Sequence, residues 1–140
     1  MSSGIVVGYD GSDCAKEAVR VGIEIGKVYG EKVVIAFGYE LNPVAGELHD
    51  YHAAVKEMAT RRLTEATALV PDADAGDVEA VIVEQAPAQA LVELADERDA
   101  RMIVVGNRGE GPLRGALLGS TPHKLLHVSD RPVLVVPAPA

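Results

Sequence analysis

The chain has 140 residues, of which 48% are apolar and only 4% aromatic, and it carries a formal net charge of −8 at pH 7. This length suits one domain with a hydrophobic core of its own. An acidic protein of this kind repels duplex nucleic acid and anionic membranes, so we exclude both as main partners.

Three absences in the sequence narrow the class of protein further. Cys14 is the single cysteine, which excludes an internal disulfide framework. No apolar run approaches the roughly 18 residues that a membrane-spanning helix needs. The N-terminus has no basic segment leading into an apolar one, so we expect no signal peptide and a cytoplasmic location.

The first predicted element is a short strand at residues 4–9, which is apolar on both faces. Ser12 closes the turn that follows and is a natural N-cap for a helix that runs to about residue 29. Gly30 ends that helix. The run KVVIAFG at 32–38 then predicts the second strand.

The same alternation of strand and helix continues to the end of the chain. After an irregular segment, apolar residues spaced three and four apart predict a long helix over about 47–69. The remaining predicted elements are a strand at 78–83, a helix from Pro87 to about 96–99, a strand at 102–105, a helix at about 121–128 and a strand at 133–136. The fold class is therefore α/β, with a parallel sheet covered by helices on both faces and a single domain over residues 1–140.

The stretch MIVVGNRGEGPLRGALLGST at 102–121 joins a buried strand, a glycine-rich loop and the start of a helix. Its spacing is Gly106-x2-Gly109-x9-Gly119-Ser120. Glycines let a ligand approach the backbone, and a helix N-terminus offers open N–H groups and a partial positive charge. The stretch therefore predicts a phosphate-binding loop, although it is neither a Walker A loop nor G-x-G-x-x-G. The alternative is an ordinary glycine-rich connection without a ligand.

This spacing resembles the nucleotide loop of the universal stress protein family, in its ATP-binding branch. The opening GIVVGYDGS, the ending RPVLVVP and the length also resemble single-domain members, so the resemblance covers nearly the whole chain. It implies a Rossmann-like sheet of the adenine nucleotide alpha hydrolase type, with strand order 3-2-1-4-5. Ligands then bind beyond the carboxyl ends of the neighbouring first and fourth strands.

The resemblance also implies the ligand, ATP with Mg²⁺, and the residues around it. The expected contacts are Gly8, Tyr9, Asp10, Gly38, Gly106, Arg108, Gly109, Gly119, Ser120 and Thr121. Asp10 is expected to bind a ribose hydroxyl or to hold the metal ion, unless it is only a turn aspartate that bonds the backbone near Ser12. Gly38 is expected to meet adenine through backbone groups, and as a glycine to loosen that edge of the pocket.

Two of these positions carry alternatives. Tyr9 is bulkier than the residue that family members usually have, so we expect it to narrow the site or to stack on the base. Arg108 is either a phosphate clamp or a solvated loop arginine. At the start of the last helix, Ser120 and Thr121 offer hydroxyls and amides to a phosphate. A structural interpretation makes Thr121 the N-cap and Pro122 the first helical residue.

Other residues are weaker candidates or depart from the family pattern. The pairs His49/His52 and His123/His127 have helical spacing for a metal, but neither has a clear third ligand. Cys14 is expected to be buried and inert. The departures are Glu110, where an acid near a phosphate is unusual, Arg101, where an aspartate is usual, and Gln85-Ala86 before Pro87.

The function that fits best is a nucleotide-dependent regulator in the cellular stress response. The alternatives are a slow ATPase or phosphotransferase, for which we find no convincing base, and an interaction module without a nucleotide. An unprotected apolar strand at a sheet edge invites pairing, so we also expect a homodimer. Its interface would be the last strand, with Val133, Leu134, Val135 and Val136.

Overall fold

The computed structural model describes residues 4–41, 49–108 and 118–139, without the side chains of residues 49 and 50. The elements in chain order are β1 (Gly4–Gly8), α1 (Asp13–Tyr29), β2 (Lys32–Tyr39), α2 (His49–Ala68), the 3₁₀ helix η2 (Asp72–Asp77), β3 (Val78–Glu84), α3 (Pro87–Arg98), β4 (Met102–Gly106), α4 (Ser120–Val128) and β5 (Val133–Val136). The predicted alternation is confirmed, with strand ends shifted by one residue at most. Within the described residues, no helix is long and apolar enough to cross a membrane.

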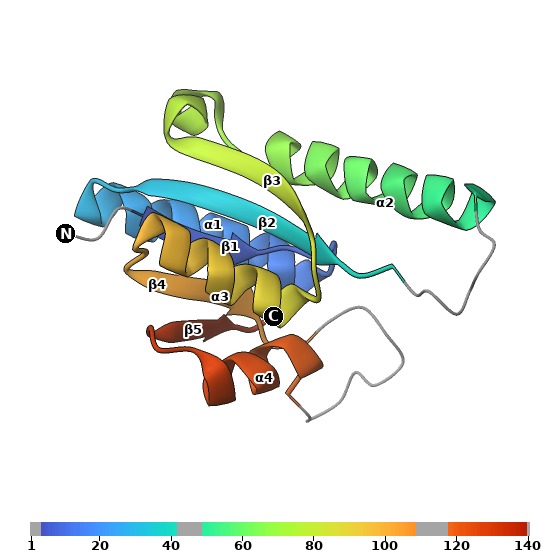
Figure 1. Cartoon of the computed structure of the whole chain (residues 1–140). Helices are drawn as coiled ribbons and strands as arrows, with labels where there is room; N and C mark the ends of the chain where they lie inside the picture. The colour runs from blue at the N-terminus through green and yellow to red at the C-terminus, as the bar shows by residue number, and fades with distance from the viewer. Residues whose placement is uncertain (1–3, 42–48, 109–117, 140) are drawn as a thin grey trace.

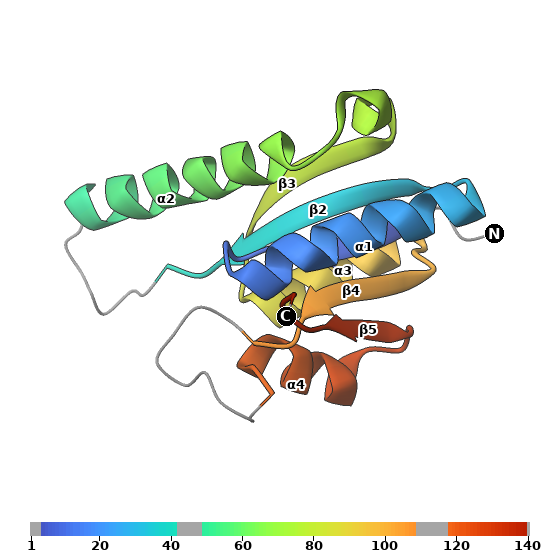
Figure 2. The same cartoon turned by 180° about the vertical axis from the view of Figure 1, so that it is seen from behind.

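The five strands form one parallel sheet in the order β3-β2-β1-β4-β5, which confirms the expected topology. Figures 1 and 2 show α3 and α4 on one face of this sheet and α1 and α2 on the other. The chain therefore reverses its winding between β1 and β4. The connections that leave the carboxyl ends of these two strands go to opposite faces of the sheet, and this is where open α/β sheets bind ligands.

The central strands are apolar throughout because both of their faces are covered. Along β1, Ile5 and Val7 pack in the cluster that contains α1, whereas Val6 packs in the cluster that contains α3 and α4. All three side chains are fully buried. Alternate residues of a strand point to opposite faces, so an uninterrupted apolar run is what such a strand needs.

Two helix ends follow the predictions and one does not. The Ser12 side chain accepts a hydrogen bond from the N–H of Ala15 at 3.2 Å, and Gly30 ends α1 with φ of 67°. The predicted N-cap at Thr121 is wrong, because α4 begins at Ser120 and Gly119 occupies the capping position. Pro122 is thus third in the helix rather than first. It still costs no hydrogen bond, because the first N–H groups of a helix have no intrahelical acceptor.

The two departures outside the loop have local explanations. Arg101 donates from Nε to Oε1 of Glu31 at 2.7 Å, and its guanidinium lies 3.8 Å from the ring centroid of Tyr29. This arginine thus ties the start of β4 to the end of α1. Ala86 occupies the N-cap of α3 without a side-chain hydrogen bond, and Pro87 begins that helix.

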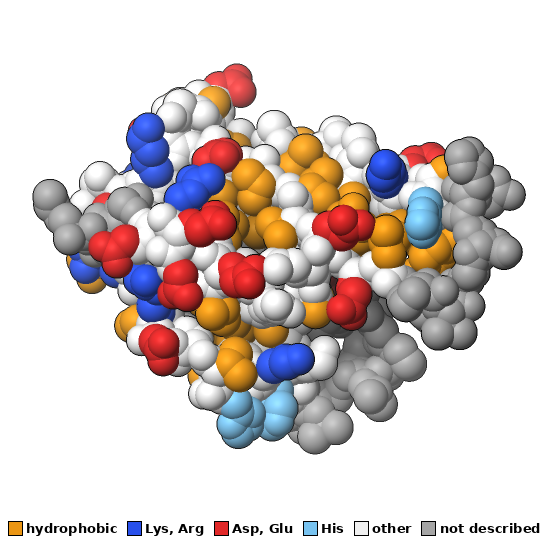
Figure 3. All heavy atoms as spheres, in the orientation of Figure 1, with side chains coloured by type: hydrophobic (Ala, Val, Ile, Leu, Met, Phe, Trp, Pro, Cys, Tyr) orange, Lys and Arg blue, Asp and Glu red, His pale blue; other side chains and the backbone are white. Residues whose placement is uncertain are grey.

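The edge strand β5 has a mixed exposure that bears on the expected dimer. Val136 is 6% exposed and belongs to the core, whereas Leu134 is 38% exposed. Leu126 on α4, which packs beside this strand, is 56% exposed. Figure 3 shows the face that carries α3 and α4, where acidic side chains are spread widely and apolar side chains remain visible between them.

Candidate functional site

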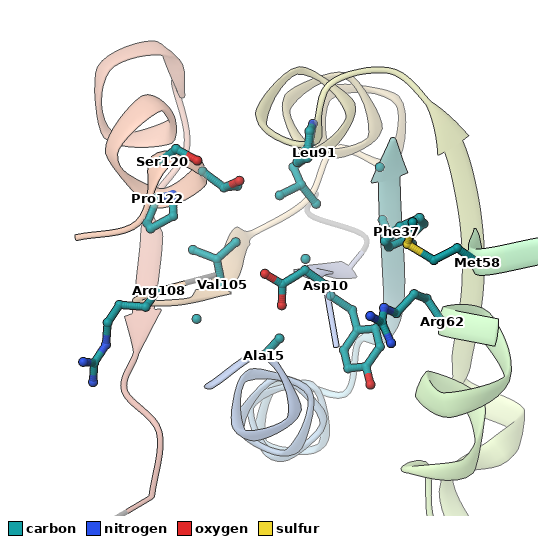
Figure 4. Close-up of a pocket in the computed structure, with 17 residues that line it drawn as sticks. Asp10, Ala15, Phe37, Met58, Arg62, Leu91, Val105, Arg108, Ser120 and Pro122 are labelled. Atoms are coloured by element: carbon teal, nitrogen blue, oxygen red, sulfur yellow. The ribbon is translucent and has the colours of Figure 1, made fainter. Parts of the chain in front are cut away.

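A cavity of about 360 Å³ opens at the carboxyl ends of β1, β2 and β4. Its volume lies in the usual range for small-molecule sites. Figure 4 shows residues of β4 and α4 on one side, residues of β2 and α2 on the other, and Asp10 between them. Eight of the expected contacts line it, namely Gly8, Tyr9, Asp10, Gly38, Gly106, Arg108, Ser120 and Thr121. The expected contacts therefore lie together at one cavity and form about half of its lining.

The other two expected contacts belong to the loop. Gly119 precedes Ser120, and its N–H donates to the carbonyl of Asn107 at 2.7 Å, which joins the two ends of the loop. Gly109 lies outside the described residues, as does Glu110.

Asp10 combines the two roles that the sequence left open. Its Oδ1 accepts hydrogen bonds from the N–H of Ser12 at 2.9 Å and from the Ser12 hydroxyl at 2.6 Å, as a turn aspartate does. Its carboxylate also lines the cavity, near the middle in Figure 4. Both bonds end on Oδ1, so the turn fixes the carboxylate and Oδ2 can still meet a ligand.

Two glycines of the cavity are required by packing as well as by any ligand. A Cβ on Gly106 would collide with Sγ of Cys14 and lie 3.0 Å from the amide nitrogen of Ala15. A Cβ on Gly38 would lie 2.9 Å from Cα of Pro87. Each strand end is thus pressed against the first turn of a helix, α1 in one case and α3 in the other. Gly38 is therefore required where the end of β2 meets the start of α3.

Cys14 is buried, as the sequence predicted, and it fastens the loop to α1. Its Sγ–H donates to the carbonyl of Arg108 at 2.7 Å, and Sγ lies 3.4 Å from Oγ of Ser12. Arg108 is therefore held by the first turn of α1, beside the Ser12 that holds Asp10.

The Tyr9 ring is 3% exposed and packs in the core on the α1 side of the sheet. Its hydroxyl donates to Oε1 of Glu65 at 3.0 Å, and Arg62 donates to both oxygens of the same carboxylate. Burial raises the pKa of the Tyr9 phenol, and the hydrogen bond to Glu65 raises it further. Tyr9 thus links β1 to α2.

A family model described as the universal stress protein family matches residues 1–137. The chain belongs to the universal stress protein family. A universal stress protein of Thermus aquaticus is 34% identical over 139 residues, covering 94% of this chain and 96% of the relative. The universal stress protein Rv1636 of Mycobacterium tuberculosis is 36% identical over 138 residues, covering 94% of each.

Solved structures agree with the fold of a universal stress protein. The hypothetical protein MJ0577 superposes with a TM-score of 0.81 at 20% identity, over 100% of this chain and 99% of that chain. A universal stress protein in complex with cAMP has a TM-score of 0.69 at 31% identity, over 99% of both chains.

The universal stress protein motifs do not reveal one wall of the cavity. Met58 and Arg62 of α2 line it together with Phe37 of β2, and Leu91 of α3 lies above them in Figure 4. The signal in the sequence was the position of Arg62. Arg62 comes one helical turn after Met58, beside the apolar stripe of the long helix. A charged residue at such a position indicates a specific partner or a ligand.

The two histidine pairs of this universal stress protein are the metal-site candidates from the sequence. The rings of His123 and His127 are 4.9 Å apart between centroids, and both are exposed. Across residues 4–41, 49–108 and 118–139, no three His, Cys, Asp or Glu side chains are grouped to hold a metal ion. The side chain of His49 lies outside the described residues.

Proposed function

We propose that this universal stress protein binds an adenine nucleotide, ATP with Mg²⁺, in the cavity and acts as a nucleotide-dependent regulator in the stress response. One observation carries the proposal: eight expected contacts line one cavity at the reversal between β1 and β4. The 31% identity to a universal stress protein solved with cAMP supports the choice of an adenine nucleotide.

The residues present suit the parts of such a ligand. Ser120 and Thr121 begin α4, where N–H groups without intrahelical acceptors and the helix dipole favour a phosphate. The Asp10 carboxylate suits a ribose hydroxyl or Mg²⁺, which prefers oxygen ligands. The backbone of Gly38, at the β2 side, suits the polar edge of adenine.

The same wall argues against fast phosphoryl transfer. Among the described residues that line the cavity, Asp10 is the only carboxylate and there is no histidine. Ser12 already occupies Oδ1 of Asp10. Phosphoryl transfer needs a residue that orients the nucleophile as well as a phosphate cradle. Nucleotide occupancy, rather than turnover, is therefore the proposed output.

We also propose that the protein is a homodimer that pairs β5 with its own copy. Leu134 is an exposed apolar side chain on an edge strand, and edge strands of this kind are normally covered or paired. A two-fold arrangement covers both edges at once.

Isothermal titration with ATP, AMP and cAMP, after mass spectrometry of nucleotide released from the purified protein, tests the binding proposal. Gly119→Val should abolish ATP binding, since the side chain fills the approach to the start of α4. The backbone of Gly119 has φ of −64° and ψ of 163°, which valine adopts readily, so the fold should survive. Unchanged affinity in this variant contradicts the loop assignment.

The rate of ATP hydrolysis tests the proposal that the protein is a regulator. Turnover with ATP and Mg²⁺ should stay far below about 1–100 s⁻¹, and a rate in that range would contradict the proposal.

A further inference from the structure

The α2 helix supplies a side of the cavity that the nucleotide-loop residues do not account for. Met58 and Arg62 are one helical turn apart and extend from α2 toward the cavity in Figure 4, with Phe37 beside the end of Met58. Met58 is 41% exposed, which is high for a thioether side chain that lines a hollow. A ligand in the cavity would cover it.

The Arg62 guanidinium is held in a defined orientation. Its Nη1 donates to Oε1 and Oε2 of Glu65 at 3.1 and 3.0 Å, and Tyr9 donates to the same carboxylate. The guanidinium also lies directly against Gly11, where an added Cβ would be 2.6 Å from Cζ and 2.7 Å from Nε. The side chain is 21% exposed. Anchored in this way, the planar group is presented at the end of β1.

The position of this group along the cavity decides what it would meet. The helix end that suits phosphate is on the α4 side, together with Arg108, and Asp10 lies in the middle (Figure 4). Arg62 and Met58 are on the opposite side, beyond Asp10. A nucleotide with its phosphates at α4 and its ribose at Asp10 would put its base there. A planar guanidinium and a thioether both pack well on the face of a purine.

We propose that Arg62 and Met58 form one wall of the base pocket, with the Arg62 guanidinium lying against the purine ring. Tyr9 and Glu65 are positioning residues that hold this guanidinium in place. The inference rests on the proposed binding of an adenine nucleotide in the cavity. It also explains why a bulky Tyr9 fits this site, since its hydroxyl completes the anchor rather than entering the base pocket.

Dissociation constants for ATP, adenosine and inorganic triphosphate test the proposal. Arg62→Ala should weaken the binding of ATP and of adenosine by the same factor, about tenfold, because the stacking of the guanidinium on the base is lost. The affinity for triphosphate should not change. Met58→Ala should act in the same direction. Arg62→Lys keeps the positive charge but not the planar guanidinium, so this variant should lose nearly as much affinity for ATP and adenosine. Arg61→Ala is the matched control, since Arg61 is 62% exposed, lies 3.7 Å from Glu57 and is not among the described residues that line the cavity.

The positioning role has its own readout. Tyr9→Phe should weaken adenosine in the wild-type background and have no further effect in the Arg62→Ala background, because it acts through Arg62. A purely structural role would weaken binding in both. Thermal unfolding without ligand checks that each variant is folded.

The outcomes separate the two levels of the proposal. Weakening confined to phosphate-bearing ligands would place the guanidinium on a phosphate and overturn the base wall. Equal adenosine affinity in the wild type, Arg62→Ala and Met58→Ala would overturn it as well. A wild-type protein that binds no adenine nucleotide at all refutes the proposed function itself, and this is seen before any variant is made.

Discussion

Gly106→Ala distinguishes a glycine required by packing from one required by a ligand. The added methyl would meet Sγ of Cys14, the carbonyl carbon of Cys14 at 2.9 Å and the amide nitrogen of Ala15 at 3.0 Å. Overpacking a tight site costs about 1–3 kcal/mol, and two of these neighbours are backbone atoms that cannot rotate away. Alanine also restricts the unfolded chain, which returns about 0.5–1 kcal/mol. These backbone contacts put the cost at the upper end of that range, about 3 kcal/mol, so we expect a net loss of about 2 kcal/mol.

The Cys14→Ala variant makes this estimate sharper. Alone it should cost about 1 kcal/mol, since it removes the hydrogen bond to the Arg108 carbonyl. In the double variant the closest contact of the new methyl is gone, but both backbone contacts remain. The double variant should then be about 1 kcal/mol more stable than the sum of the single effects predicts.

Urea unfolding of the four proteins, without nucleotide and at one protein concentration, measures these differences. Additivity within about 0.5 kcal/mol would mean that the methyl does not meet the sulfur. A Gly106→Ala variant as stable as the wild type, with lowered ATP affinity, would refute the packing argument and leave the ligand as the reason for this glycine.

Three other predictions follow from contacts already described. Burial would raise the pKa of Glu65, but hydrogen bonds from Tyr9 and Arg62 hold that pKa below its ordinary 4.5. Glu65 therefore stabilises the fold at pH values above 4.5. This contribution is lost as the pH falls through the lowered pKa that Glu65 has in the folded protein. Tyr9→Phe should raise the pKa of Glu65 in a carboxyl NMR titration and weaken this acid dependence; an unchanged pKa would contradict the link. Leu134→Lys should convert a dimer to a monomer in light scattering at tens of micromolar, because it puts a charge on the edge strand. A wild-type monomer would contradict the β5 interface, and Val136→Lys is unsuitable because Val136 is core. Arg101→Ala should destabilise the protein in urea more than Arg20→Ala, because the Glu31 partner is 9% exposed while Glu17 and Glu24 are 21% and 65% exposed; equal losses would contradict this.

The central strands β1, β2 and β4 were predictable from sequence because each one is a short apolar run that helices cover on both faces. The start of α4 was not, since proline is permitted at several positions of a first turn and only the Gly119 carbonyl, which accepts from His123 N–H, decides between them. Strand order came from the family resemblance and not from periodicity, which carries no information on neighbours.

The loop side of the candidate site was predictable because its residues lie within one short stretch of the chain, 106–121. The α2 side was not, because the role of Arg62 depends on how a distant helix is rotated about its axis. The orientation of the Tyr9 side chain depends on the same helix, because Glu65, which accepts the hydrogen bond from its hydroxyl, is 56 positions away in the sequence. Likewise, the packing role of Gly38 required knowing where α3 begins.

The small number of buried residues on α2 bears on how ligand binding in the cavity would affect the surface of the protein. Within the side chains described on this helix, only Ala59 and Ala66 are buried, whereas α1 buries seven residues, including Val19 and Ile23. Helices held by few apolar contacts open locally at low free energy. A molecule that touches both Arg62 and Asp10 would join this helix to the turn after β1, so it would bind the opened form less well. Binding of a ligand in the cavity would then increase the fraction of molecules in which α2 is packed on the sheet. The outer surface of α2 would thus differ between the free and the ligand-bound protein.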